Sequence, residues 1–205
     1  MVDVSERVGC WPLHIFIDIE DSQLRNLIEH SALLEENNRL SPCPSPLHCS
    51  LSRSELTLAK NQIKPLLKDL RDAVSKVAQN EPRKIYISAK QFLLLENESK
   101  DQLFVCFELF DLANSLPKLL QAINAVLGRY GKDTYYENPI IHTSLFEIAQ
   151  TSDCETMLVD EEHRIREKLD MSDSMSDLKQ ELEFIELDRV PIIMKYGDNM
   201  VDLSA

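Results

Sequence analysis

The chain has 205 residues, of which 43% are hydrophobic and 28% are charged, and its formal net charge is −13 at pH 7. These proportions are ordinary for a globular protein, and the length fits one domain or two small lobes that share a core. The acidic balance argues against a broad nucleic-acid-binding surface, but not against a pocket that grips only a few nucleotides.

No apolar run approaches the length that spans a bilayer, and the N-terminal residues lack the basic and apolar regions of a signal peptide. The five cysteines are an odd number without a paired spacing. These features favour a protein of a reducing compartment that is neither secreted nor bound to a membrane.

The first quarter of the chain predicts a strand, a helix, a loop and a second strand. Residues 11–19 are β-branched and apolar, which is typical of a strand. Asp21 or Ser22 can cap the helix that follows. Three prolines within 41–46 exclude regular structure there, and a strand is expected over 47–53.

The middle of the chain predicts two helices that flank a β-hairpin. A helix is expected from about residue 57 to 77, with Pro65 near its first turns. Residues 84–95 and 103–110 are strand-like and are separated by a polar loop. A second helix should run from Asn114 or Ser115 to about residue 130. Its apolar face is expected to consist of Leu119, Leu120, Ile123, Val126 and Leu127.

The last part of the chain predicts a strand over 140–148, an acidic helix and loop inserted over 151–180, and a closing hairpin of 182–187 and 190–195. The order of elements in the second half roughly repeats that of the first half. We therefore expect an α+β fold in which residues 1–205 form a single domain of two interleaved, pseudo-symmetric lobes, each an antiparallel sheet with helices.

The tetrapeptide H-x-S-L occurs twice, at residues 48–51 and 142–145. Among the five histidines, only His48 and His142 have Ser at +2 and Leu at +3. Both motifs fall in predicted strands, where residues i and i+2 point to the same face. Each motif therefore presents an imidazole beside a hydroxyl. Two such pairs that face each other across a central groove would supply a base, an acid and two hydroxyl donors.

That set of groups suits attack on a phosphodiester without a metal ion. Cleavage of RNA by its own 2′-hydroxyl needs a base for the 2′-oxygen, an acid for the leaving 5′-oxygen, and donors for the phosphoryl oxygens. Histidine suits the first two roles because its unperturbed pKa lies near neutrality. Since one imidazole must be neutral and the other protonated, a bell-shaped pH profile is expected.

With the twin motif in a duplicated α+β fold, the chain resembles the 2H phosphoesterase superfamily. The resemblance is closest to the 3′-to-5′ exoribonucleases that trim the 3′ end of U6 spliceosomal RNA. Residues 11–17 resemble the first strand of that family, and residues 48–52 resemble its first H-x-S-L-S motif. Residues 135–139, followed by 142–145, resemble its aromatic-Y-x-D-P segment and its second motif. The resemblance covers nearly the whole chain and is weakest over 151–180.

The resemblance implies a role for five residues. His48 and His142 would be the catalytic pair, with His142 as the base for the 2′-hydroxyl and His48 as the acid. Ser50 and Ser144 would donate hydrogen bonds to the phosphate oxygens. Tyr136 would stack on the terminal base.

The resemblance also implies a substrate. Family members remove 3′-terminal uridines and leave a 2′,3′-cyclic phosphate, which some members open to a phosphate. A single-stranded RNA 3′ end, U6 in particular, would be the partner of a monomeric protein of the nucleus, with mitochondria as a second location. Neither DNA nor a cofactor or metal is expected. The departures are Asn138, where the family often has Asp, and Phe146-Glu147, where it often has Ala-Trp. They bear on substrate preference more than on mechanism.

Other residues have weaker signals. His14 fits a structural role in the first strand, whereas Arg53 and Lys90 could meet phosphate or lie on solvated surface. Cys43 and Cys49 lack the spacing of zinc ligands. The hairpin aromatics expected in the core are Phe92, Phe107 and Phe110.

Three other functions are compatible with the sequence. The chain could be another 2H enzyme that acts on small 2′,3′-cyclic nucleotides. It could also be a nucleotide-binding module without activity, although both motifs are intact. Finally, it could be an interaction scaffold whose acidic segment is the important part.

Overall fold

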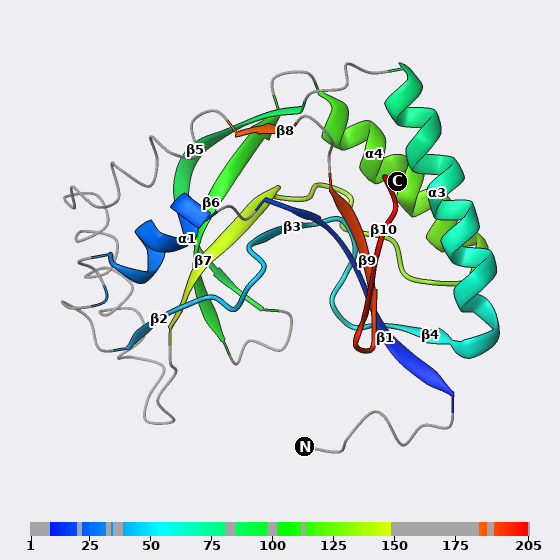
Figure 1. The fold of residues 1–205 in the computed structure, drawn as a ribbon, viewed down its shortest axis with the longest axis horizontal. Helices are drawn as coiled ribbons and strands as arrows, with labels where there is room; N and C mark the ends of the chain where they lie inside the picture. Colours follow the sequence, from blue (N-terminus) through cyan, green and yellow to red (C-terminus); the bar gives the residue numbers. More distant parts are fainter. Residues whose placement is uncertain are drawn as a thin grey trace.

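One antiparallel sheet organises the molecule in the computed structural model (Figure 1). The structure describes residues 9–19, 22–31, 34, 39–80, 85–97, 102–111, 114–148, 185–187 and 191–204. The acidic segment expected over 151–180 lies outside these residues.

Ten strands of the described part pair into this sheet. They are β1 Cys10–Asp18, β2 Leu40–Pro42, β3 His48–Ser50, β4 Leu56–Ala59, β5 Ile85–Glu96, β6 Leu103–Asp111, β7 His142–Ile148, β8 Ile185–Leu187, β9 Ile192–Tyr196 and β10 Asn199–Asp202. Their order along the sheet is β10-β9-β1-β3-β7-β6-β5-β8, with β2 added to β7 and β4 added to β1. The two motif strands, β3 and β7, are therefore neighbours at the centre.

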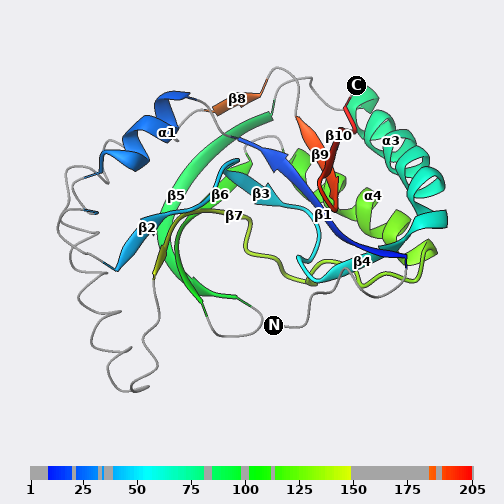
Figure 2. The ribbon, with the colours of Figure 1, turned by 60° about the horizontal axis from the view of Figure 1, so that its bottom comes forward.

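The helices lie at the two ends of the sheet. The described helices are α1 Ser22–Glu29, α3 Ile63–Asn80, α4 Ser115–Arg129 and the short 3-10 helix η2 Lys60–Gln62. Figures 1 and 2 show α3 and α4 side by side near β9 and β10, and α1 at the opposite end. None of the described helices is both long enough and apolar enough to cross a membrane.

The first strand shows why these residues form a central strand. Leu13, Ile15 and Ile17 alternate along β1 and are fully buried on one face of the sheet. The intervening His14 and Phe16 point to the other face, where the motifs lie. The alternation thus places the apolar side chains of Leu13, Ile15 and Ile17 in the core and the His14 imidazole on the face of the motif histidines and serines.

Helix α4 begins at the expected place, and its predicted apolar face is confirmed because all five residues are buried. Asn114 precedes it in a left-handed conformation, with φ of 55°. The carboxylate of Asp111, rather than the Asn114 side chain, accepts a hydrogen bond from the Leu116 amide at 2.7 Å. This bond satisfies one of the free amides of the first helical turn.

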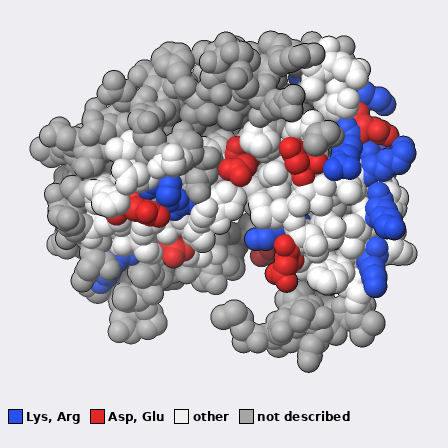
Figure 3. Space-filling model, in the orientation of Figure 1, with Lys and Arg blue, Asp and Glu red and all other residues white. Residues whose placement is uncertain are grey.

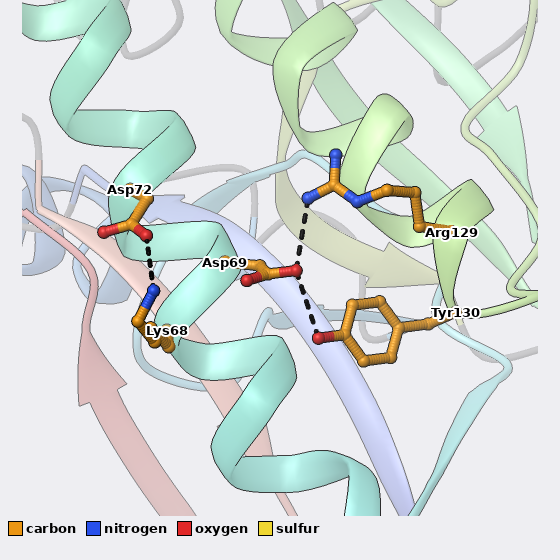
Figure 4. Close-up of polar contacts among 5 residues, drawn as sticks. All are labelled: Lys68, Asp69, Asp72, Arg129 and Tyr130. Atoms are coloured by element: carbon orange, nitrogen blue, oxygen red, sulfur yellow. Dashed lines mark hydrogen bonds and ion pairs between the residues drawn. The ribbon is translucent and has the colours of Figure 1, made fainter.

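Polar contacts join α4 to α3 at the surface (Figure 4). Asp69 Oδ2 accepts hydrogen bonds from Arg129 Nη2 and from the Tyr130 hydroxyl, both at 3.2 Å. Lys68 pairs with Asp72 one turn further along α3, at 3.0 Å. Because these groups are largely exposed, they contribute little stability, and the apolar contact beneath them holds the helices together.

The predicted start of the long helix was wrong. Residues 56–59 form strand β4, which pairs with β1, and α3 begins only at Ile63. Leu56 and Leu58 are buried and Thr57 is exposed, so the segment has the two-residue period of a strand. Pro65 lies in the first turn of α3, as expected.

The closing hairpin predicted from 182–187 and 190–195 was also wrong. Strand β8 pairs with β5, whereas β9 pairs with β1 and forms its hairpin with β10. The turn of that hairpin contains Gly197, with φ of 54°. A Cβ there would collide with the ring of Trp11, so the turn requires glycine on both counts.

Two smaller predictions were also wrong, the absence of regular structure throughout 41–46 and the burial of Phe110. Ser41 and Pro42 belong to the short strand β2, and β7 is its one partner among the described strands. Pro42 therefore lies at an edge of the described sheet, where proline is tolerated. Phe110 is 52% exposed and does not fill the core, whereas Phe107 is fully buried and its ring centroid lies 3.9 Å from that of Phe92.

The predicted α+β class with an antiparallel sheet is confirmed. The sheet is continuous, and its two halves meet where β3 pairs with β7. Figure 1 shows α3 and α4 together on one half, so the described helices are not divided evenly between the halves. The pseudo-two-fold relation between lobes stays a prediction.

The buried hydroxyl of Thr143 provides a stability test. Its Oγ1 has no hydrogen-bond partner among the described residues, and the side chain is fully buried. Because an unsatisfied buried hydroxyl is costly, Thr143→Val should raise the free energy of unfolding by about 1 kcal/mol. Urea unfolding followed by circular dichroism measures this change. Thr57→Val, at an exposed strand position, is the matched control and should change stability much less. A lower urea midpoint for Thr143→Val would contradict the assignment of an unsatisfied hydroxyl.

Candidate active site

The two motifs meet through one pair of residues. Cys49 on β3 lies opposite Thr143 on β7 in the antiparallel register. Both side chains are buried on the core face, with exposed fractions of 1% and 0%. Since successive residues of a strand point to opposite faces, the residues that flank this pair all point to the other face.

The register then sets which motif residues face each other. In an antiparallel pair, the residue before Cys49 lies opposite the residue after Thr143. His48 is therefore opposite Ser144, and Ser50 is opposite His142. Each imidazole faces the hydroxyl of the other motif, and the two histidines lie on a diagonal, with Cα atoms roughly 7–8 Å apart.

Both imidazoles are anchored in the same way. His48 Nδ1 lies 2.9 Å from the carbonyl oxygen of Pro46, and His142 Nδ1 lies 2.7 Å from that of Ile140. A carbonyl only accepts, so Nδ1 carries the hydrogen and donates it. The Nε2 atom of each ring is left to accept or deliver a proton. In both motifs the acceptor is two residues before the histidine, so the local backbone sets the tautomer.

Burial favours the neutral form of both imidazoles. It lowers the pKa of His48 and of His142 below the usual 6.5, although the bonds to the two carbonyls oppose this shift. The charge of a protonated His48 also contributes to the lowered pKa of His142. Two adjacent imidazoles of this kind do not both hold a proton easily, which separates their roles into base and acid.

Each serine of the motifs has a partner on the adjoining strand. Ser50 Oγ lies 3.1 Å from His14 Nε2, and Ser144 Oγ lies 3.3 Å from Cys106 Sγ. Burial raises the pKa of Cys106 to about 12, so it partners Ser144 as a neutral thiol. Sequence reasoning missed both contacts, because they depend on the pairing of strands that are far apart in the chain.

His14 is a third imidazole of the site. Its ring centroid lies 5.1 Å from that of His48, edge to face, and both rings contact Phe16. Burial, together with the charges of His48 and Lys195, lowers the pKa of His14 to about 3. The structural role expected for His14 thus takes a specific form, a neutral ring that holds Ser50 and packs against His48.

All five predicted site residues line one groove of about 700 Å³. One end is aromatic and basic. There the Arg53 guanidinium lies 4.7 Å from the centre of the Tyr136 ring, and Arg53 Nε donates to the Thr134 carbonyl at 3.1 Å. Tyr136 is 41% exposed and lines the groove, whereas Tyr135 beside it is buried.

The other end of the groove is polar and is lined by Asn97, Gln102 and Glu147, which the sequence did not predict as site residues. Glu147 lies there because β7 contains a bulge, with Val105 opposite Phe146 and Cys106 opposite Ser144. The extra residue, Leu145, shifts the alternation of the strand. Phe146 is therefore buried, and Glu147 lines the groove with His142 and Ser144.

Two weaker sequence signals can be placed. Cys43 and Cys49 are buried thiols, and burial raises the pKa of each to about 12. Within the described ranges, no three His, Cys, Asp or Glu side chains gather as metal ligands do. The Lys90 side chain lies outside the described part.

The surface charge is unevenly distributed. Figure 3 shows Lys and Arg side chains gathered along the edge of the molecule that α3 forms. Four exposed cations of η2 and α3 recur every three or four residues, which places them on one stripe: Lys60, Lys64, Lys68 and Arg71. In the groove, Arg53 is the cation found among the described lining residues.

Comparisons with known proteins identify the family of the chain and similar folds. Residues 4–203 match the model of the HVSL family, which is described as an uncharacterised conserved protein. The fold is similar to that of Usb1 from Kluyveromyces marxianus, with a TM-score of 0.65 and 16% identity over 96% of this chain and 98% of that one. It is also similar to the same protein with uridine monophosphate, with a TM-score of 0.69 and 16% identity over 96% and 99%. No curated protein matches the chain in sequence.

Replacement of His14 tests its neutral state through the pH dependence of stability. The pKa of His14 is about 3 in the folded protein and about 6.5 in the unfolded chain, so its contribution is present above 6.5 and is lost as the pH falls. Between pH 6.5 and pH 5 this loss is about 2 kcal/mol. In His14→Gln the decline over this window should be smaller by that amount, measured by urea unfolding. His30→Gln, at an exposed position just after α1, is the control. Its stability should decline over this pH window as that of the unchanged protein does. Equal slopes for all three proteins would show that His14 is not held neutral.

Proposed function

The chain belongs to the HVSL family, and we propose that it is a metal-independent 3′-to-5′ exoribonuclease that trims 3′-terminal uridines of U6 small nuclear RNA. One observation carries the proposal, the pairing of β3 with β7 that sets two His-x-Ser motifs face to face in one groove. The similarity of the fold to Usb1, including a structure with uridine monophosphate, supports a uridine nucleotide as the ligand. A nuclear location is proposed on the same grounds.

The proposed reaction is an attack by the 2′-oxygen of the penultimate nucleotide on the phosphorus that follows it. One imidazole Nε2 takes the 2′-hydroxyl proton as the P–O2′ bond forms. The other delivers a proton to the 5′-oxygen as the P–O5′ bond breaks. The products are a nucleoside with a free 5′-hydroxyl and an RNA that ends in a 2′,3′-cyclic phosphate, which water can open to a phosphate.

Ser50 and Ser144 are the proposed donors to the phosphoryl oxygens, where negative charge develops. When His14 Nε2 carries the hydrogen, it donates to Ser50 Oγ and leaves the Ser50 hydroxyl hydrogen for a phosphate oxygen. Cys106 can act on Ser144 in the same sense through its thiol hydrogen. These contacts hold the donors in place before the substrate arrives, which lowers the cost of reorganisation.

Tyr136 is the proposed stacking platform for the terminal base. It lies at the end of the groove where Arg53 contacts its ring, and its exposed fraction of 41% leaves room for a base. Stacking of this kind is worth about 1–3 kcal/mol per base. The alternative role of a core tyrosine belongs to the neighbouring Tyr135, which is 8% exposed.

The order of residues along the groove supports an assignment of the two histidines. Arg53 follows Ser50 at the end of β3 and contacts Tyr136, so we infer that both lie beyond the pair formed by Ser50 and His142. In the opposite direction, Glu147 follows Ser144 along β7 and lies beyond the pair formed by Ser144 and His48. A terminal base on Tyr136 therefore brings the leaving 5′-oxygen toward His142 and the attacking 2′-hydroxyl toward His48. We propose His48 as the base and His142 as the acid, the reverse of the assignment that the sequence resemblance implied.

The principal test is a time course of RNA shortening. The purified protein is incubated with an RNA that ends in several uridines, in excess EDTA, beside His48→Ala and His142→Ala. Stepwise loss of 3′ nucleotides by the unchanged protein is expected, with a loss of activity of about 10²-fold or more in each variant, since each removes a general acid or base. His30→Ala, at an exposed position that does not line the groove, is the control and should retain full activity.

The outcomes of this experiment also separate the other functions. Shortening that EDTA abolishes would exclude the twin-histidine mechanism on this substrate. Turnover of small 2′,3′-cyclic nucleotides without shortening would indicate another 2H enzyme. Binding of uridine monophosphate without turnover of either substrate would indicate a nucleotide-binding module, and neither binding nor turnover would leave the scaffold role.

The pH dependence and the acid assignment can be tested together. Because burial lowers the pKa of both histidines, the protonated member is lost as the pH rises, so kcat/KM should peak below pH 6.5 and fall toward neutrality. Rates of single cleavage between about pH 5 and pH 8 check this profile. A substrate with sulfur in place of the bridging 5′-oxygen needs no acid, so it should restore cleavage by His142→Ala and not by His48→Ala. An optimum above neutrality would contradict the first expectation, and rescue of His48→Ala alone would reverse the assignment.

A further inference from the structure

The polar end of the groove forms a surface that can recognise a base. Glu147 Oε1 accepts a hydrogen bond from Ser41 Oγ at 3.2 Å, and Glu147 Oε2 accepts one from Gln102 Nε2 at 2.6 Å. Gln102 is itself held by Asn97, through bonds between Gln102 N and Asn97 Oδ1 at 3.2 Å and between Asn97 N and Gln102 O at 3.0 Å. The Glu147 carboxylate is thus oriented from both sides by residues of three separate segments.

The sheet places this carboxylate beside an apolar wall. Phe104 on β6 lies opposite Glu147 on β7, and Leu95 on β5 lies opposite Phe104. All three line the groove, and each of the three side chains is partly exposed. A planar ring can lie against Phe104 and Leu95 while its edge meets the carboxylate, which is the usual arrangement of a base-binding pocket.

The position along the groove identifies which base would occupy it. Ser144 follows His142 toward Glu147 on the same strand, so Glu147 lies beyond the scissile phosphate on the side away from Tyr136. If the terminal base stacks on Tyr136, the base of the penultimate nucleotide reaches Glu147. This step rests on the function proposed above.

We propose that Glu147 reads the base of the penultimate nucleotide and favours guanine over uracil. A carboxylate only accepts, and its two oxygens offer about four lone-pair sites in all. Ser41 and Gln102 use one site on each oxygen, which leaves one on each for a pair of parallel N–H donors. Guanine presents such a pair on its Watson–Crick edge, from N1–H and the N2 amino group.

Uracil offers the wrong pattern to this carboxylate. Its single N3–H lies between two carbonyl oxygens, which would face the negative carboxylate. Adenine and cytosine present one amino group beside an unprotonated ring nitrogen and are intermediate. The position of Glu147 is one where the resembling family often has tryptophan, so this selectivity is a property of this chain. Opposite ends of the groove then recognise the terminal base and the penultimate base of the RNA.

The test uses short oligonucleotides in which only the penultimate nucleotide carries a 2′-hydroxyl, so that a single cleavage is possible. The terminal base is uracil throughout, and the penultimate base is guanine, adenine, cytosine or uracil. The unchanged protein should cleave the guanine substrate about tenfold more efficiently, in kcat/KM, than the uracil substrate, which is the scale of one bidentate contact.

The expected signature is a change in the ratio of substrates rather than in overall rate. Glu147→Gln should reduce the guanine-to-uracil ratio to about one. Gln102→Met, which removes one of the two bonds that orient the carboxylate, should reduce the ratio partway and serves as a second variant if the first does not fold. Glu108→Gln is the matched control. Glu108 lies on β6, accepts a bond from Gln91 and does not line the groove, so its replacement should leave the ratio unchanged.

The outcomes distinguish this proposal from the proposed function. Equal cleavage of all four substrates by the unchanged protein would overturn the role of Glu147 and leave the exoribonuclease intact. A uniform loss of rate on all four substrates in Glu147→Gln would likewise overturn it, because it would show a structural role. No cleavage of any substrate by the unchanged protein would overturn the proposed function, and the selectivity with it.

Discussion

The arrangement of the candidate site depends on the pairing of Cys49 with Thr143 across two neighbouring strands. Because both side chains are buried, neither strand can rotate about its axis or slip by one residue without moving an apolar contact into the groove. The flanking histidines and serines are consequently held on the opposite face at fixed relative positions. The short length of β3, only three residues, matters little, since β1 and β7 hold it on both sides.

The same constraint explains the electrostatics of the site. The groove lies on one face of the sheet, and the core lies on the other face. The imidazoles of His14, His48 and His142 are therefore partly buried, which lowers their pKa values. Backbone carbonyls at Pro46 and Ile140 then set the tautomer of the two motif rings. Between the two motifs, a phosphate meets the hydroxyls of Ser50 and Ser144 and the imidazoles of His48 and His142, whereas the Glu147 carboxylate lies further along β7.

The extent to which the sequence predicts the fold depends on how local each signal is. The apolar positions of α4 follow the period of a helix, and they are buried as expected. Strand β4 and the pairing of β9 with β1 were missed, because they depend on contacts between segments more than 40 residues apart. Phe110 was expected in the core, yet its side chain near the end of β6 is exposed to solvent. A single strand residue does not indicate which face of the sheet other elements will cover.

The sequence by itself determined the chemistry of the site and the family. Two H-x-S-L motifs specify two imidazole–hydroxyl pairs in any strand, since the two-residue period is a property of the backbone. Only the tertiary structure decided how the pairs face each other, because register and strand order arise from burial summed over the whole sheet. It alone placed His14 against Ser50 and, through the bulge in β7, turned Glu147 into the groove. One additional residue in a strand moves the side chain of every later residue to the opposite face of the sheet. No local sequence pattern around Leu145 predicts that bulge.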